Sequence, residues 1–220
     1  MINEARADTV TRIADCGIVA VIRMQDRSRV RAVVDALAAG GITALEVTMT
    51  VPGAIELIGE IAPTLPEGFA FGAGTVVDPD TARAAVRAGA RFIVSPVFRP
   101  AVIEASHAEG AAVMPGCFSP TEILAAWDAG ADVVKVFPAT ALGPAYFKDL
   151  RGPMPHVRLM PTGGVSLENA GEWIRAGAVA IGVGGALVDS TLVAAGNYGA
   201  ITDRAKRFIQ RVRQARETSA

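Results

Sequence analysis

Short apolar runs recur along the chain and alternate with alanine-rich amphipathic stretches. Runs of three to six residues that are almost wholly apolar predict strands buried on both faces, as in a parallel sheet. Eight such runs begin 20 to 27 residues apart, which leaves room for a strand, a loop, a helix and a return turn. The runs are residues 18–22, 42–47, 69–73, 91–94, 112–114, 132–137, 157–160 and 179–183.

Glycines and capping residues mark the ends of the predicted helices. Each of the four clearest amphipathic stretches is followed by a glycine, which adopts the left-handed conformation that ends a helix without steric cost. Asp78 and Ser119, each followed by proline, and Ser166 are the predicted N-terminal caps, and Ser119 forms a capping box with Glu122. The stretches and their glycines are 29–39 with Gly40, 81–88 with Gly89, 121–129 with Gly130 and 167–176 with Gly177.

This order of elements predicts an α/β protein of the (β/α)8 TIM-barrel type. Eight strands that alternate with helices favour a closed barrel over an open, doubly wound sheet. The chain has no linker and no low-complexity segment, so residues 1–220 are expected to form a single barrel domain. Residues 2–15 predict an extra N-terminal helix that closes the bottom of the barrel, and residues 198–216 predict the last outer helix.

Composition and charge limit the classes of protein and of partner that fit this sequence. The formal net charge of −1 gives no electrostatic reason to expect a nucleic acid or an acidic membrane as partner. No stretch approaches the roughly 18 apolar residues of a membrane span, and the first residues lack the apolar core of a secretory signal. Cys16 and Cys117 form no CxxC motif, which favours a reducing cytoplasm, and His107 and His156 form no zinc-binding motif.

Lys135 is the most informative residue of the sequence, because it interrupts an otherwise apolar run. Strand alternation places Lys135 and Phe137 on one face and Val134 and Val136 on the other. If the two valines pack against helices, the amine points into the barrel mouth, where lost hydration lowers its pKa and makes it a nucleophile for carbonyl carbons. The alternative is a lysine whose ammonium group reaches solvent or pairs with a carboxylate.

Two further ionisable residues lie at the predicted carboxyl ends of strands. Glu46 shares one face of its strand with Thr48 and Thr50, and it is a candidate to move protons near a lysine imine. It could instead form a structural ion pair with Lys135 or Arg23. Arg23 ends the first strand, where its guanidinium could hold a carboxylate or phosphate, or tie the barrel rim together.

Glycine-rich turns follow the third, seventh and eighth predicted strands. Pro-Thr-Gly-Gly at 161–164 and Gly-Val-Gly-Gly-Ala at 182–186 lie where barrels often bind phosphate, because glycine lets backbone N–H groups approach an anion. Together they predict a phosphate site, although a tight bend at the rim would explain either one alone. Gly-Ala-Gly-Thr at 72–75 clears space in the mouth, and the Thr75 hydroxyl could hold a substrate carboxylate.

At these residues the chain resembles the 2-keto-3-deoxy-6-phosphogluconate (KDPG) and 4-hydroxy-2-oxoglutarate (KHG) aldolase family, over nearly its whole length. The resemblance implies a class I aldolase that needs no metal or other cofactor and yields pyruvate and an aldehyde, usually glyceraldehyde 3-phosphate. The motifs that carry it are Leu-Glu-Val-Thr at 45–48, Gly-Ala-Gly-Thr at 72–75, Ser-Pro at 95–96, Pro-Gly at 115–116, Lys-Val-Phe-Pro at 135–138 and Pro-Thr-Gly-Gly at 161–164.

The resemblance also implies roles for the site residues. Lys135 would form an imine with the pyruvyl carbonyl, Glu46 would move the protons, and Arg23 and Thr75 would contact the substrate. Because family members are commonly homotrimers, the expected partners are pyruvate, a sugar acid phosphate and further copies of the chain. The residues that would line the pyruvate pocket are Pro96 and Phe137, and those that would bind phosphate are Thr162, Gly163, Gly164, Gly185 and Ala186.

Two departures from the family pattern bear on substrate binding. Some members have an arginine where Thr50 stands, so Arg23 could compensate by holding the substrate carboxylate. Others have a serine where Gly185 stands, so the phosphate contact at that loop could come from backbone N–H groups alone.

Three functions fit these features. Cleavage of KDPG is the first, with the same chemistry on 2-keto-3-deoxy-6-phosphogalactonate or KHG as variants. A phosphosugar isomerase or epimerase would share the barrel and its phosphate loops, but it would need acid–base pairs and no imine. A non-catalytic binder of phosphorylated sugar acids would keep all function after a Lys135→Met substitution.

Overall fold

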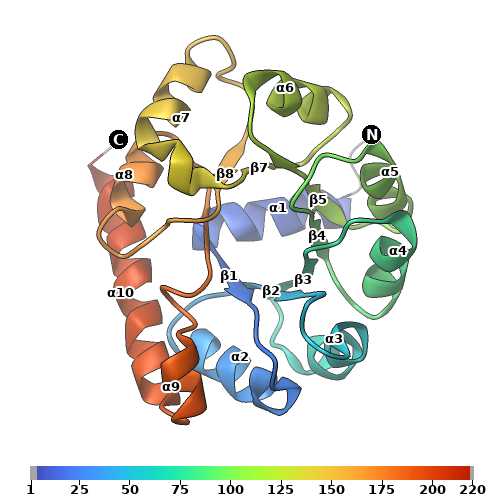
Figure 1. The fold of residues 1–220 in the computed structure, drawn as a ribbon, viewed down its shortest axis with the longest axis vertical. Helices are drawn as coiled ribbons and strands as arrows, with labels where there is room; N and C mark the ends of the chain where they lie inside the picture. Colours follow the sequence, from blue (N-terminus) through green and yellow to red (C-terminus); the bar gives the residue numbers. More distant parts are fainter. Residues whose placement is uncertain (1–3, 219–220) are drawn as a thin grey trace.

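Parallel β-strands alternate with α-helices throughout the computed structural model, which describes residues 4–218 (Figure 1). Eight of the nine strands in these residues overlap the apolar runs that predicted them. The ninth, residues 116–117, lies beyond the fifth predicted run, which ends at residue 114, and Pro115 separates the two. The strands are β1 (Ile18–Ile22), β2 (Ala44–Thr48), β3 (Ala70–Gly74), β4 (Phe92–Val94), β5 (Ala112–Met114), β6 (Gly116–Cys117), β7 (Val134–Val136), β8 (Leu159–Pro161) and β9 (Ile181–Val183).

All strand pairs are parallel, and they fall into two sheets. One sheet has the order β5-β4-β3-β2-β1-β9 and the other has the order β6-β7-β8. Only Pro115 separates β5 from β6, and a parallel bridge between Thr162 and Gly182 joins the segment after β8 to β9. The predicted α/β class and the parallel strands are therefore confirmed.

Helices surround the strands, and α1 crosses one end of them (Figure 1). The predicted N-terminal helix included residues 2 and 3, which lie outside the described part of the chain. The α-helices are α1 (Glu4–Cys16), α2 (Val30–Ala39), α3 (Ala54–Ile61), α4 (Pro79–Arg87), α5 (Pro100–Ala108), α6 (Pro120–Asp128), α7 (Gly143–Arg151), α8 (Ala170–Arg175), α9 (Ser190–Ala194) and α10 (Tyr198–Glu217). Within residues 4–218, three 3-10 helices span Arg27–Arg29, Ala62–Thr64 and Ala139–Ala141.

None of the helices within residues 4–218 is both long enough and apolar enough to cross a membrane.

Most predicted helix ends are confirmed, and two are wrong. Asp78 caps α4 and Ser119 forms the capping box of α6, as predicted. Ser166 does not cap α8, because this helix begins at Ala170. The Asn169 side chain, just before the helix, accepts a hydrogen bond from the backbone N–H of Ser166 and donates one to the backbone oxygen of Gly164. After α2 the left-handed residue is Gly41, with a φ of 91°, rather than Gly40.

Strand alternation separates two apolar layers. Val134 and Val136 of β7 are buried in the layer between the strands and the outer helices. Val133 belongs to a second cluster that the strands enclose and to which Ile13 of α1 contributes. Because Lys135 has the same parity as Val133, its side chain points toward the enclosed interior, as the sequence predicted.

Asp132 fixes the start of the segment that carries β7. Its carboxylate is 4% exposed, forms an ion pair with Arg6 Nε of α1 at 3.0 Å and contacts His107 Nε2 of α5 at 3.0 Å. The same carboxylate accepts a hydrogen bond from the backbone N–H of Val113 at 2.9 Å. Asp132 thus ties two helices and the neighbouring strand to the amino end of β7.

Candidate active site

Strand β7 directs the Lys135 amine into the interior. The residue is 5% exposed, and its Nζ lies 4.7 Å from the centroid of the Phe137 ring. Burial lowers the pKa of Lys135 more than the nearby Glu46 carboxylate raises it, and the Arg23 guanidinium lowers it further. A lysine with a lowered pKa is uncharged in a larger fraction of molecules, so it is a better nucleophile for a carbonyl carbon. The alternative in which the ammonium group reaches bulk solvent is excluded by this burial.

Glu46 occupies the middle of β2 and is 1% exposed. Burial raises the pKa of Glu46, while the positive charges of Lys135 and Arg23 lower it. Within residues 4–218, the Glu46 Oε2 atom has no hydrogen-bond partner. A buried carboxylate oxygen without a partner is costly for the folded state, and this oxygen is available to a bound reactant.

Lys135 and Glu46 lie within electrostatic reach of one another, because each shifts the pKa of the other. In the described part of the chain, however, no nitrogen–oxygen contact of 4.0 Å or less joins Glu46 to Lys135 or to Arg23. The structural ion pair that the sequence left open is therefore not formed. The amine and the carboxylate remain separate groups that can act on one bound molecule.

Arg23 and Thr75 meet at the carboxyl ends of β1 and β3. The Arg23 Nη2 atom donates a hydrogen bond to Thr75 Oγ1 at 3.3 Å. Thr75 has a φ of 61° and is the only non-glycine residue with a positive φ among residues 4–218. A threonine in this conformation is strained, and such strain is often found where a side chain must be held at a ligand site. The pair provides a guanidinium and a hydroxyl that suit a carboxylate.

Thr50 lies beyond the end of β2, in a turn, and is exposed. The Thr48 hydroxyl donates to the backbone oxygen of Ile22 at 3.2 Å, and its oxygen lies 2.7 Å from Thr50 Oγ1. Because Thr48 has one hydroxyl hydrogen and uses it on Ile22, Thr50 donates to Thr48. Thr50 is thus held beside the strand end without a charge of its own.

Phe137 lies beside the Lys135 amine, and the Pro96 backbone lies beside β6, the strand that pairs with β7. Gly116 pairs in register with Lys135, and a Cβ atom on Gly116 would lie 2.3 Å from the carbonyl of Pro96. Glycine is required here because the Pro96 backbone approaches so closely. Both Pro96 and Phe137 are half-buried.

The glycine-rich turns line one cavity of about 640 Å³. Gly163 and Gly164 have φ values of 90° and 71°, which other residues adopt only at a steric cost. The Thr162 Oγ1 atom is buried without a hydrogen-bond partner in residues 4–218, and it faces Gly182 closely. The candidate residues that line this cavity are Arg23, Phe137, Thr162, Gly163, Gly164, Gly185 and Ala186.

The sequence did not identify the contribution of α9 and the residues just before it. Val188, together with Ser190 and Thr191 of the first turn of α9, also lines the cavity of the glycine-rich turns. Asp189 caps α9 by accepting hydrogen bonds from the backbone of Thr191 and Leu192. The Asp-Ser-Thr triplet at 189–191 was the available signal, since such residues favour helix starts.

Other nucleophilic or metal-binding side chains are engaged elsewhere. Burial raises the pKa of Cys117 to about 12, so its thiol stays protonated near neutral pH. His107 contacts Asp132, and His156 packs edge-on against Trp127. In the described residues no group of three or more His, Cys, Asp or Glu side chains is arranged to hold a metal ion.

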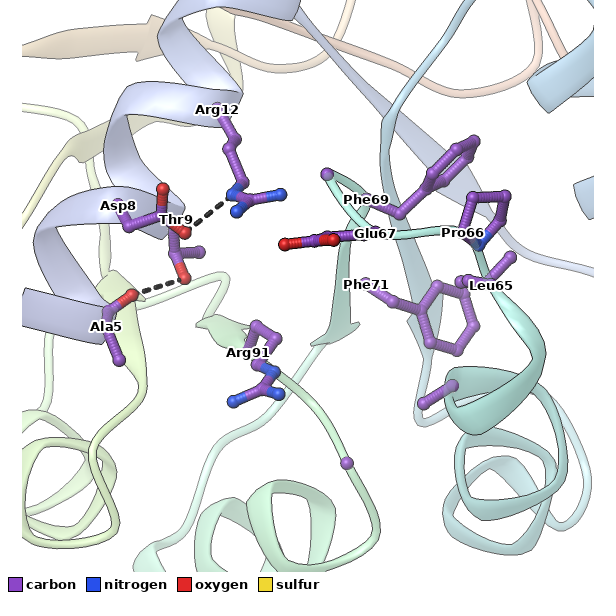
Figure 2. A pocket seen from close by; sticks show the side chains of 13 residues that line it. Ala5, Asp8, Thr9, Arg12, Leu65, Pro66, Glu67, Phe69, Phe71 and Arg91 are labelled. Carbon is purple, nitrogen blue, oxygen red and sulfur yellow. Dashed lines mark hydrogen bonds and ion pairs between the residues drawn. The ribbon is translucent and has the colours of Figure 1, made fainter.

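A separate cavity of about 340 Å³ lies at the amino ends of β3 and β4, beside α1. Figure 2 shows Arg12 and Asp8 of α1 on one side, Glu67 opposite them and Arg91 nearby. Asp8 accepts a hydrogen bond from Arg12 Nε at 2.6 Å. Because this cavity and Lys135 are at opposite ends of the strands, it is not part of the candidate active site.

A family model described as KDPG and KHG aldolase matches residues 10–204. A 2-dehydro-3-deoxy-phosphogluconate aldolase from Pseudomonas aeruginosa is 33% identical over 213 residues, which is 96% of each chain. Among solved structures, one described as native KDPGal has a TM-score of 0.84 at 31% identity and covers 91% of this chain and 96% of its own.

A second solved structure bears on the chemistry of relatives. It is KDPG aldolase from Legionella pneumophila with pyruvate captured at low pH as a covalent carbinolamine intermediate. Its TM-score is 0.83 at 30% identity, with 90% of this chain and 96% of that chain covered. The isomerase, epimerase and non-catalytic hypotheses are therefore set aside. The chain belongs to the KDPG and KHG aldolase family and is an aldehyde-lyase.

Proposed function

We propose that this protein is a class I aldolase that reversibly cleaves 2-keto-3-deoxy-6-phosphogluconate to pyruvate and glyceraldehyde 3-phosphate through an imine on Lys135. The observation that carries the proposal is the burial of the Lys135 amine beside the buried Glu46 carboxylate, with no ion pair between them. A relative with a covalent carbinolamine of pyruvate supports it.

The bonds change in a fixed order. The uncharged Lys135 amine adds to the C2 carbonyl carbon, and loss of water from the carbinolamine gives the imine. The C3–C4 bond then breaks, its electron pair enters the imine as an enamine, and Glu46 takes the proton of the C4 hydroxyl as the aldehyde leaves. Protonation of C3 and addition of water release pyruvate and restore the amine. The reaction needs no oxidant or reductant.

The two ends of the substrate would be held by two neighbouring anion sites, and Arg23 lines both. Arg23 and Thr75 would bind the carboxylate, with Thr50 at its edge. Pro96 and Phe137 would flank the pyruvyl group. The phosphate would lie in the cavity lined by Thr162, Gly163, Gly164, Gly185 and Ala186. Such binding, remote from the broken bond, orients that bond for cleavage.

The domain organisation, the cellular compartment and the assembly are proposed together with the reaction. We infer that the two sheets are parts of one (β/α)8 barrel domain, because β5 and β6 are separated by one residue and a bridge joins the β8 and β9 segments. Cys16 and Cys117 are both free, which supports a reducing cytoplasm. A homotrimer is the proposed assembly, on the family resemblance alone.

Reduction with borohydride in the presence of pyruvate tests the mechanism. Mass spectrometry of peptides should find a reduced pyruvyl group on Lys135, and the Lys135→Met variant should show none. Lys148→Met is the matched control, because Lys148 is exposed on α7 and its loss should leave the adduct unchanged. No adduct, or an adduct on another lysine, would reject the imine mechanism.

The choice of substrate is tested by a second assay. Pyruvate release from KDPG should be faster than from 2-keto-3-deoxy-6-phosphogalactonate or KHG. Faster release from one of the other two would overturn the proposed substrate while leaving the aldolase chemistry intact.

A further inference from the structure

A second chamber adjoins the cavity of the glycine-rich turns. It measures about 480 Å³ and lies between the loop after β1 and helix α9. Arg23, Val188 and Ser190 line both spaces, so the chamber lies next to the cavity of the glycine-rich turns at these three residues. Its volume falls within the range of cavities that hold small-molecule ligands.

Most of the chamber wall that a ligand could contact is apolar. Met24, Val188, Val193 and Ala194 supply hydrocarbon surface from both sides. Val188 and Val193 are each 7% exposed, so they present a fixed surface rather than mobile side chains. Burying hydrocarbon against such a surface is favourable because it removes apolar area from water.

The charged groups at the rim are already engaged. The Arg29 Nε atom pairs with the Asp26 carboxylate at 2.8 Å, and the Arg29 guanidinium also donates to the backbone oxygens of Val193 and Ala194. These bonds fix the loop after β1 against the end of α9. An anionic or cationic ligand would therefore find little unpaired charge in the chamber beyond Arg23.

We propose that this chamber binds an apolar substituent on the aldehyde half of the substrate, so that the enzyme also makes and cleaves 4-hydroxy-2-oxo acids with hydrocarbon tails. The inference rests on the proposed aldolase function. In the forward condensation, the enamine carbon of pyruvate bonds to the aldehyde carbon, the aldehyde oxygen takes the proton carried by Glu46, and water releases the product from Lys135. Atoms and electrons balance with pyruvate and the aldehyde alone.

Condensation of pyruvate with hexanal, propanal and glyceraldehyde 3-phosphate tests the chamber. A hydrocarbon tail held in the chamber would bury more apolar area for hexanal than for propanal, so kcat/KM for hexanal should exceed that for propanal at least tenfold. The Ala194→Trp substitution fills the chamber from an exposed position and should remove this preference, with the glyceraldehyde 3-phosphate reaction unchanged. Ala195→Trp is the matched control, because Ala195 is exposed on the same helix end but does not line the chamber.

A second variant guards against misfolding of the first. Met24→Gln makes one wall polar with little change in volume, and it should lower the hexanal rate selectively. Equal rates for hexanal and propanal, or an equal loss for all three aldehydes in both variants, would overturn the chamber proposal. If the borohydride adduct forms and glyceraldehyde 3-phosphate reacts, that failure concerns the chamber alone. If neither occurs, the proposed function itself has failed.

Discussion

The carboxylate of Glu46 lies directly against the backbone of Gly74, where a Cβ atom would be 2.5 Å from Oε1. The two residues come from neighbouring parallel strands, in which Thr48 is the register partner of Gly74. The absence of a side chain at position 74 is therefore what lets the carboxylate occupy its place. The Gly-Ala-Gly-Thr motif thus determines where the Glu46 carboxylate lies, as well as leaving open space around it.

Gly74→Ala should displace the Glu46 carboxylate and lower kcat about 10- to 100-fold, because small misplacements of a reacting group are costly. The borohydride adduct on Lys135 should still form, since the amine is not displaced. Gly59→Ala on α3 is the control, because the nearest atom to its Cβ would be 3.8 Å away. Unchanged kcat in Gly74→Ala would mean that the position of this carboxylate does not limit the reaction.

Lys135→Met should lower aldolase activity by at least about 10³-fold and raise the free energy of unfolding by about 1 kcal/mol near neutral pH, since a buried amine is replaced by a side chain of similar length. The pKa of Lys135 is lowered in the folded protein, so the unfolded chain binds more protons between that value and 10.5. Stability of the natural protein therefore rises with pH across this window, and the variant should lose the rise. Urea unfolding at several pH values measures both effects, and a less stable variant would contradict the first.

Arg23→Gln should move the pH profile of imine formation to higher pH. Arg23 lowers the pKa of both Lys135 and Glu46, so both pKa values rise when its charge is removed. The uncharged amine then needs a higher pH to form. Inactivation by pyruvate and borohydride, followed as a function of pH, measures the shift. Arg27→Gln is the control on the same loop, because Arg27 pairs with Glu60 at 3.2 Å, and an equal shift there would indicate a general charge effect.

Gly185→Ser should be tolerated and should lower KM for a phosphorylated substrate several-fold, through one added hydrogen bond to an anion. No atom lies within 4 Å of the Cβ position at Gly185. Gly182→Ser is the contrasting variant, because its Cβ would collide with the Thr162 hydroxyl and should destabilise the protein. Steady-state kinetics and thermal unfolding of the pair check the prediction, which an unchanged KM would refute.

The strands and the face of Lys135 could be predicted because strand alternation is a strong and local signal. Apolar parity alone placed Val134 and Val136 toward the helices and the amine toward the interior. The chamber beside α9 could not be predicted, because a five-residue helix is too short to show helical periodicity. The positive φ of Thr75 was equally hidden, since nothing in the residue type predicts a conformation that the surrounding backbone imposes.

The contacts of Asp132 affect more than the stability of the amino end of β7. Asp132 stands three positions before Lys135, and its contacts hold the segment that leads into β7. Sliding this segment by a single residue would reverse every side chain on it, turning the amine out among apolar helices and a valine into the reaction space. The position of the Lys135 amine is thus determined by contacts at the end of the strands opposite the candidate active site.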